Sequence, residues 1–173
     1  SNWPPGSSEI APPRSLACIE AVSFQLSPDS DESQRRLAMA EWLAHRDNPL
    51  TWRSAVNRVW HYHFGTGIVD TPNDFGRMGG VPSHPELLDW LALRFRDDGG
   101  SLKSLHRLIC TSSVYRQAST SPHDYSDVDA DNRFLWRMDR RRLEAEEIRD
   151  SVLFVAGQLD ETMYGPGFQD FVV

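Results

Sequence analysis

The sequence predicts an all-α fold: an irregular orthogonal bundle of about five or six helices with an extended N-terminal lead-in. Apolar residues recur at three- and four-residue spacing in several segments, as they do on the buried face of an amphipathic helix. Short connections separate these segments, and no internal repeat of solenoid length is present. We therefore expect no sheet of consequence. We assign residues 1–32 to the lead-in and 33–173 to a helical domain.

The lead-in contains several proline and glycine steps and no sustained apolar period, which is typical of extended chain. The sequence allows a short strand over 19–25. The first helix is predicted to begin near Ser33, because apolar residues then recur at helical spacing as far as Ala44. The turn residues Asp47-Asn48-Pro49 end it.

A second helix is predicted over 50–64, and its inward stripe is largely aromatic and aliphatic. The stripe consists of Trp52, Ala55, Val56, Val59, Trp60, His63 and Phe64. The next segment, 65–83, contains five glycines and two prolines, and its pair Asn73-Asp74 can hydrogen-bond its own backbone. We expect a long ordered loop there, and loops of this length often have a function.

Two further helices are predicted after this loop. Ser83 and Glu86 have the spacing of a capping box, and the helix that they open extends to Gly99. Ser101 then caps a fourth helix, which carries an apolar stripe and runs to about Tyr115.

The last part of the chain is predicted to be a loop followed by helix. Residues 118–131 are polar and rich in turn formers, which indicates an exposed loop. From about Asn132 the chain is predicted to be helical again, with a long helix that ends near Asp160. The predicted inward face of that helix consists of Ile148, Val152, Val155, Ala156 and Leu159.

The composition argues against two kinds of association. The chain has 25 acidic and 18 basic side chains among its 173 residues, and its net charge of -7 repels polyanions. Nucleic acid is therefore not an expected partner. The longest apolar runs are only a few residues, so we expect no membrane-spanning segment.

Cysteine and histidine spacing predicts neither a metal site nor a haem site in this segment. Cys18 and Cys110 match no metal or redox motif, so we expect two free thiols, with a disulfide between them as the alternative. Without a C-x-x-C-H motif, the segment cannot attach c-type haem covalently. His61 and His63 point about 200° apart on a helix and cannot ligate one ion. We expect His63 to be a core residue hydrogen-bonded to backbone.

One polar grouping stands out, because it combines the second helix, the glycine-rich loop and the start of the third helix. A cleft is expected where these three segments meet. Its candidate catalytic residues are Asp74, His84 and His63, and its candidate binding residues are Asn57, Arg58, Asn73 and Arg77. Histidine and aspartate in one cleft can serve as acid and base, although packing explains the same residues more often.

Several ordered motifs resemble those of the first planctomycete secreted domain, a family of unknown function. They include Val56-Asn-Arg-Val-Trp60, His63-Phe-Gly65, Thr71-Pro-Asn-Asp-Phe-Gly76 and His84-Pro-Glu-Leu-Leu-Asp-Trp-Leu91, and the resemblance spans about 36–167. One departure is Tyr62, where the family commonly has a second adjacent histidine.

The resemblance implies a large exported protein with a second planctomycete-specific domain and, often, a cytochrome-like c-type haem domain upstream. It also implies that part of the domain's C-terminal portion is missing here.

Three functions follow as hypotheses. The first is a helical interaction or scaffold module whose partners are other domains of the same exported polypeptide; it predicts no deep polar pocket around Asp74. The second is a hydrolase that acts on carbohydrate or another polymer and uses the His/Asp cleft. The third is a docking surface for an electron-transfer partner. The sequence does not decide the oligomeric state.

Overall fold

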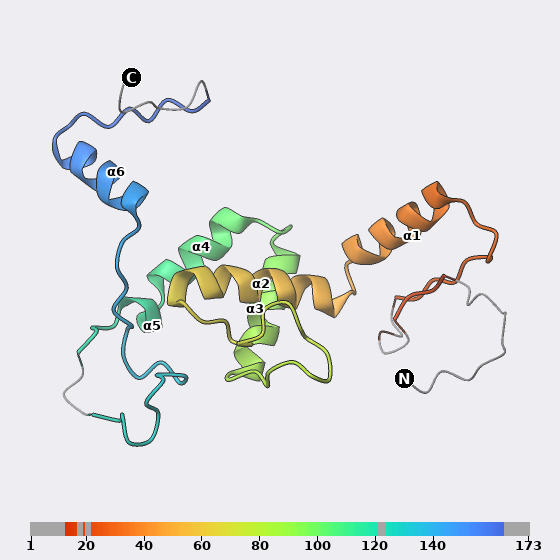
Figure 1. Ribbon diagram of the computed structural model, residues 1–173, viewed down its shortest axis with the longest axis horizontal. Helices are drawn as coiled ribbons and strands as arrows, with labels where there is room; N and C mark the ends of the chain where they lie inside the picture. The colour runs from red at the N-terminus through yellow and green to blue at the C-terminus, as the bar shows by residue number, and fades with distance from the viewer. Residues whose placement is uncertain (1–12, 17–18, 20–21, 121–123, 165–173) are drawn as a thin grey trace. The chain divides into compact units, whose positions relative to one another are not determined.

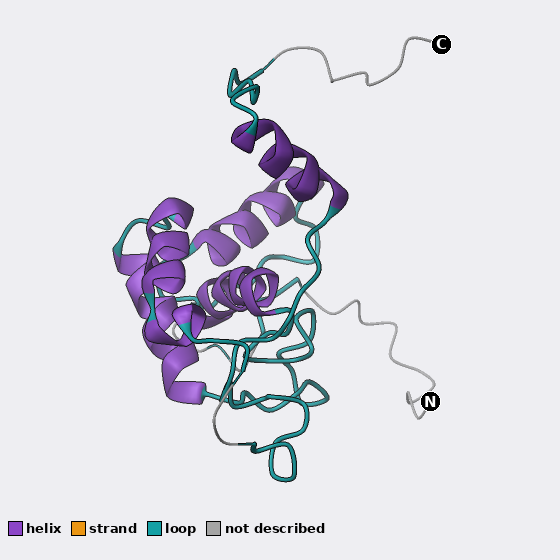
Figure 2. Ribbon diagram, turned by 90° about the vertical axis from the view of Figure 1, so that its left-hand side faces the viewer, coloured by secondary structure: helices purple, strands orange, loops and turns teal. Residues whose placement is uncertain are grey.

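The computed structural model describes residues 13–16, 19, 22–120 and 124–164. These residues form six α-helices and no strand, so the predicted all-α class is confirmed for the part of the chain that is described. Figure 2 shows helices joined by loops throughout. The chain divides into two compact units, residues 1–139 and 140–173.

The described part of the lead-in packs on the first helix, α1 (Glu32–Ala44). Two backbone hydrogen bonds, Ser15 N to Phe24 O and Leu26 N to Pro13 O, bring its two arms together around an isolated bridge. Trp42 of α1 is buried among the apolar side chains of the lead-in and donates from Nε1 to the lead-in backbone at 2.9 Å. Residues 20 and 21 of the predicted strand lie outside the described residues.

The main core lies between α2 (Pro49–Phe64), α3 (Pro85–Asp97) and α4 (Leu102–Thr111). Figure 1 shows α3 crossing α2. The buried cluster consists of Val56, Val59, Trp60, Phe64, Ile68, Val69, Leu88, Leu91, Phe95, Leu105 and Ile109. Trp60 stacks on Phe64 with ring centroids 4.2 Å apart, and Trp52 meets Phe95 edge to face. The predicted aromatic stripe of the second helix therefore does face the core.

The loop after α2 begins as part of this core. Gly65 adopts the left-handed conformation, with a φ of 85°, and ends the helix, after which Ile68 and Val69 are buried against it. The predicted capping box at Ser83 is wrong, because α3 has His84 at its N-cap without a side-chain capping bond. Ser83 instead donates to Ile68 O from its backbone N–H and from its hydroxyl.

The fourth helix is interrupted before the predicted end. Ser112 is extended and separates α4 from the short helix α5 (Ser113–Arg116). Its hydroxyl donates to Ile109 O at 2.6 Å and accepts from Tyr115 N at 3.3 Å. A serine that bonds backbone on both sides competes with the helical hydrogen bonds, which explains the break.

Residues 132–144 are not helical, so the prediction that helix resumes near Asn132 is wrong. Asn132 and Leu135 both have positive φ, and Asn132 is buried. The side-chain amide of Asn132 donates to the backbone carbonyl of Arg137 and accepts from the backbone N–H of Arg137. These two bonds fix an irregular turn.

In the second unit, α6 (Ala145–Val155) begins with a capping box between Glu144 and Glu147 and ends before the predicted Asp160. The predicted inward face of α6 is also wrong, because none of the helix's residues is buried. Ile148, Val152 and Val155 are 51%, 62% and 86% exposed. Helical spacing of apolar residues predicts the helix, but only packing against another element can bury its stripe.

Candidate functional site

A groove lies beside α2, between the lead-in and the loop that follows the helix. We call it the Arg58 groove; its volume is about 560 Å³. Its walls are Leu16, Ile19, Pro49, Leu50, Arg53, Ser54, Arg58, Pro72, Asn73, Phe75 and Gly76. Most of these side chains are apolar. Pockets for small ligands or side chains have volumes of this order and similar linings.

Two arginines of α2 stand five residues apart in the wall of this groove. The guanidinium of Arg53 bonds the carboxylate of Asp89 on α3 at 2.6 Å, so its charge is balanced within the fold. Arg58 is exposed, and its Nη2 donates to the neutral side-chain oxygen of Asn73 at 2.9 Å. In the described part of the chain no carboxylate bonds Arg58. The groove therefore carries an unbalanced positive charge at its rim.

The loop segment that forms the opposite wall is fixed by its own hydrogen bonds. Thr71 accepts from Asp74 N at its carbonyl and donates from its hydroxyl to Asp74 O. The Asp74 carboxylate accepts from Gly76 N at 2.8 Å, which is an Asx turn. Asp74 is exposed, and its carboxylate serves the turn that presents Phe75 and Gly76 to the groove.

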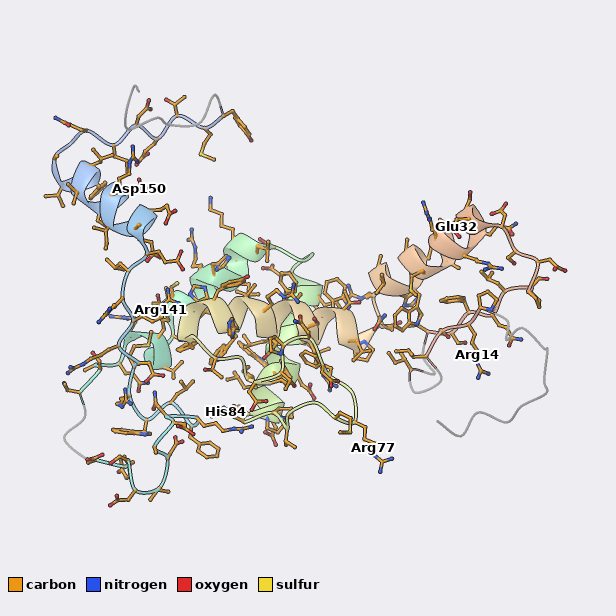
Figure 3. All side chains as sticks on the ribbon, viewed as in Figure 1. Arg14, Glu32, Arg77, His84, Arg141 and Asp150 are labelled. Carbon is orange, nitrogen blue, oxygen red and sulfur yellow. The ribbon has the colours of Figure 1, made fainter. Side chains whose placement is uncertain are left out.

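Among the predicted binding residues, Asn57 has a structural position. It is fully buried, and its amide donates to Val69 O and accepts from Val69 N. Arg77 stands at the tip of the loop, and Figure 3 shows its side chain directed away from α2 and α3. The structure therefore brings Arg58 and Asn73 together in the groove. The other two predicted binding residues, Asn57 and Arg77, do not line it.

The predicted catalytic residues have three different sets of neighbours. His84 Nδ1 lies 2.9 Å from Ser83 Oγ, and its ring meets Phe134 edge to face. Asp74 bonds within its turn, as described above. His63 is half-buried at the end of α2, where its Nε2 lies 2.8 Å from His106 Nδ1. His63 is therefore at the edge of the core, in contact with polar side chains.

The sequence identified Cys110 only as an expected free thiol and gave no role to His106, yet both residues face His63. Cys110 Sγ lies 3.9 Å from His63 Nδ1, and the thiol forms no disulfide. Cys18 lies outside the described residues. The available signal was the four-residue spacing of His106 and Cys110, which places both on one face of a helix. The apolar groove residues Leu16 and Ile19 gave no such signal, because the lead-in has no periodicity.

Two further findings concern only the described residues. They contain no group of three or more histidine, cysteine, aspartate or glutamate side chains arranged to hold a metal ion. Nor is any helix among them both long and apolar enough to cross a membrane.

The model of the PSD1 family, described as protein of unknown function (DUF1553), matches residues 35–172. The chain belongs to the PSD1 family. The sequence resemblance is thus confirmed at the level of the family. No curated protein and no solved structure matches the chain.

The PSD1 match covers only part of the Arg58 groove. The walls formed by α2 and the following loop lie within the matched range, whereas Leu16 and Ile19 precede it. The groove combines an apolar surface with a guanidinium that bonds a neutral amide. This arrangement suits the binding of a ligand with apolar and acidic groups.

Proposed function

We propose that this PSD1 chain is a helical interaction module of a larger exported protein, and that the Arg58 groove binds an extended apolar and acidic segment from another domain of the same polypeptide. The main support for this proposal is the hydrogen bond between Arg58 and Asn73 at the rim of an apolar groove. A carboxylate that replaced the neutral Asn73 oxygen would add its own negative charge to the hydrogen bond, and its two oxygens can pair with the planar guanidinium in bidentate geometry.

Charge distribution supports an acidic partner. The chain as a whole has a net charge of -7, yet both ionised residues that line this groove are arginines. Arg53 is balanced by Asp89, so the attraction for an acidic group comes mainly from Arg58. Charge complementarity of this kind selects partners and orients them in an interface.

The construction of the loop supports a binding role over a catalytic one. Asp74 is exposed and its carboxylate accepts from Gly76 N, so this carboxylate is open to water and serves the turn. Hydrogen bonds hold the turn in one conformation, and a preformed surface loses less entropy when it binds.

The charge preference is tested with two blocked, fluorescently labelled hexapeptides. In one, glutamate alternates with leucine and phenylalanine; in the other, lysine replaces glutamate. Fluorescence anisotropy should show tighter binding of the glutamate peptide to the 173-residue chain, and Arg58→Gln should weaken it by about tenfold. Arg94→Gln, an exposed arginine of α3 outside this groove, is the matched control and should bind as the parent does. Equal affinity for the two peptides would contradict the proposal.

The source of the bound segment is tested in the full-length protein. A photo-crosslinking amino acid replaces Phe75, which lines the groove, and peptides joined to it are identified by mass spectrometry. We expect crosslinks to another domain of the same chain. Crosslinks to a second copy, recognised with isotope-mixed protein, would show self-association and overturn this assignment.

The setting in an exported protein with a c-type haem domain elsewhere is supported by the motif resemblance. Fractionation of the native cells, followed by peroxidase staining for covalent haem on the band that carries this sequence, tests both parts of this setting. Recovery of the protein in the cytoplasmic fraction would contradict export.

A further inference from the structure

A thiol and two imidazoles meet where the end of α2 approaches α4, away from the residues of the Arg58 groove. His63 lies in the last turn of α2, and His106 and Cys110 are one helical turn apart on α4. Nε2 of His63 lies 2.8 Å from Nδ1 of His106, and Nδ1 of His63 lies 3.9 Å from Cys110 Sγ. His63 therefore stands between the thiol and the second imidazole.

This order of groups gives His63 a defined part in proton transfer. When its Nε2–H donates to His106 Nδ1, the His63 Nδ1 carries a lone pair that faces the Cys110 sulfur. After the thiol proton moves to Nδ1, His63 has two N–H groups, one facing His106 and one facing the thiolate. A base next to a thiol, itself oriented by a third group, is the arrangement that activates a cysteine nucleophile.

Neighbouring residues fix the His63 ring without closing the site to small reagents. Tyr115 and His106 both meet the ring edge to face, with centroids 5.5 Å and 5.0 Å away. Cys110 and His63 are half-buried, and His106 is exposed. The reactive form of cysteine is the thiolate, and its reactivity depends on such partners and on access.

We propose that Cys110 is a nucleophilic thiol that forms mixed disulfides with low-molecular-weight disulfides, with His63 as the acceptor of its proton. His106 is a positioning residue that holds the ring. The Cys110 thiolate attacks one sulfur of the small disulfide, a new S–S bond forms, and the S–S bond of the reagent breaks. The leaving thiolate then takes up the proton held by His63, so one small thiol is released per modified chain.

The test uses bis(2-hydroxyethyl) disulfide, an uncharged reagent, with the intact 173-residue chain. Peptide mass spectrometry follows Cys110 separately from Cys18. Near neutral pH, we expect Cys110 to react at least about tenfold faster in the folded chain than in the same chain unfolded in urea. A folded rate no higher than the unfolded rate would overturn the proposal.

Three variants separate proton transfer from folding. His63→Gln should lower the folded rate to about that of the unfolded chain, and circular dichroism reports whether its helices persist. His106→Asn, at an exposed position that leaves the core intact, should shift the rate profile to higher pH while the rate at high pH is retained. Ser104→Ala, also exposed on α4, should match the parent. A folded His63→Gln variant with the parental rate would exclude His63 as the proton acceptor, and an unshifted His106→Asn profile would exclude His106 as the positioning residue.

Discussion

The side-chain amide of Asn57 forms two hydrogen bonds with the backbone of Val69. Val69 N donates to Asn57 Oδ1 at 2.8 Å, and Asn57 Nδ2 donates to Val69 O at 2.9 Å. The pair joins the middle of α2 to the start of the loop that later forms a wall of the Arg58 groove. Both residues are buried, so no water can replace either bond.

Asn57→Ala is expected to lower the free energy of unfolding by about 3 kcal/mol, because it leaves a buried N–H and a buried C=O without partners. Urea denaturation followed by circular dichroism measures the change. Asn73→Ala is the control, since Asn73 is exposed and its side chain accepts from the exposed Arg58; it should cost less than about 1 kcal/mol. Similar losses in the two variants would show that the Asn57 bonds are not important for stability.

Gly67 has no room for a side chain. A Cβ there would lie 2.7 Å from Asn57 Nδ2 and would also meet Val69 O, so Gly67→Ala should cost about 1–3 kcal/mol. Gly76→Ala in the same loop is the comparison, because its added carbon would meet one side-chain oxygen of Asp74 at the longer distance of 3.1 Å. Thermal unfolding of both variants checks the order, and a more stable Gly67→Ala variant would contradict the packing seen here.

Two isoleucines on helices are expected to differ in their effects on stability. Ile109 of α4 is 2% exposed, so Ile109→Ala should cost about 2–5 kcal/mol. Ile148 of α6 is 51% exposed, so Ile148→Ala should change the free energy of unfolding by less than about 0.5 kcal/mol. Urea denaturation of the two variants measures both changes in the free energy of unfolding. A large loss from Ile148→Ala would indicate that α6 buries this stripe after all.

Asp97 at the end of α3 should make stability depend on pH in the acid range. A hydrogen bond from Arg96 and the charges of Arg96 and Arg46 hold the pKa of this carboxyl below its usual value of 3.8. The ionised form is favoured by folding, so the contribution is present above that value and is lost as the pH falls below it. Asp97→Asn should therefore flatten the dependence of melting temperature on pH below about pH 4. An unchanged slope would mean that Arg96 and Arg46 do not favour the ionised form in solution.

The sequence by itself determined where most of the helices lie. The apolar stripe that contains Trp52, Val56 and Trp60 has the 3.6-residue period, and Gly65 and the turn after Ala44 end their helices by local conformation. These are short-range effects, so they can be read from neighbouring residues. The errors have local causes of another kind, because Ser112 and Asn132 use their side chains to bond nearby backbone in place of the helical pattern.

Only the tertiary structure decided which polar residues come together. Asn57, Arg58 and His63 lie within two turns of one helix, yet one is buried against the loop, one faces the Arg58 groove and one meets α4. The partners Val69, Asn73 and His106 are 12, 15 and 43 residues away. Side-chain direction around a helix follows from the sequence, but the element that lies opposite each face depends on how the helices pack, and spacing along the chain does not contain that information.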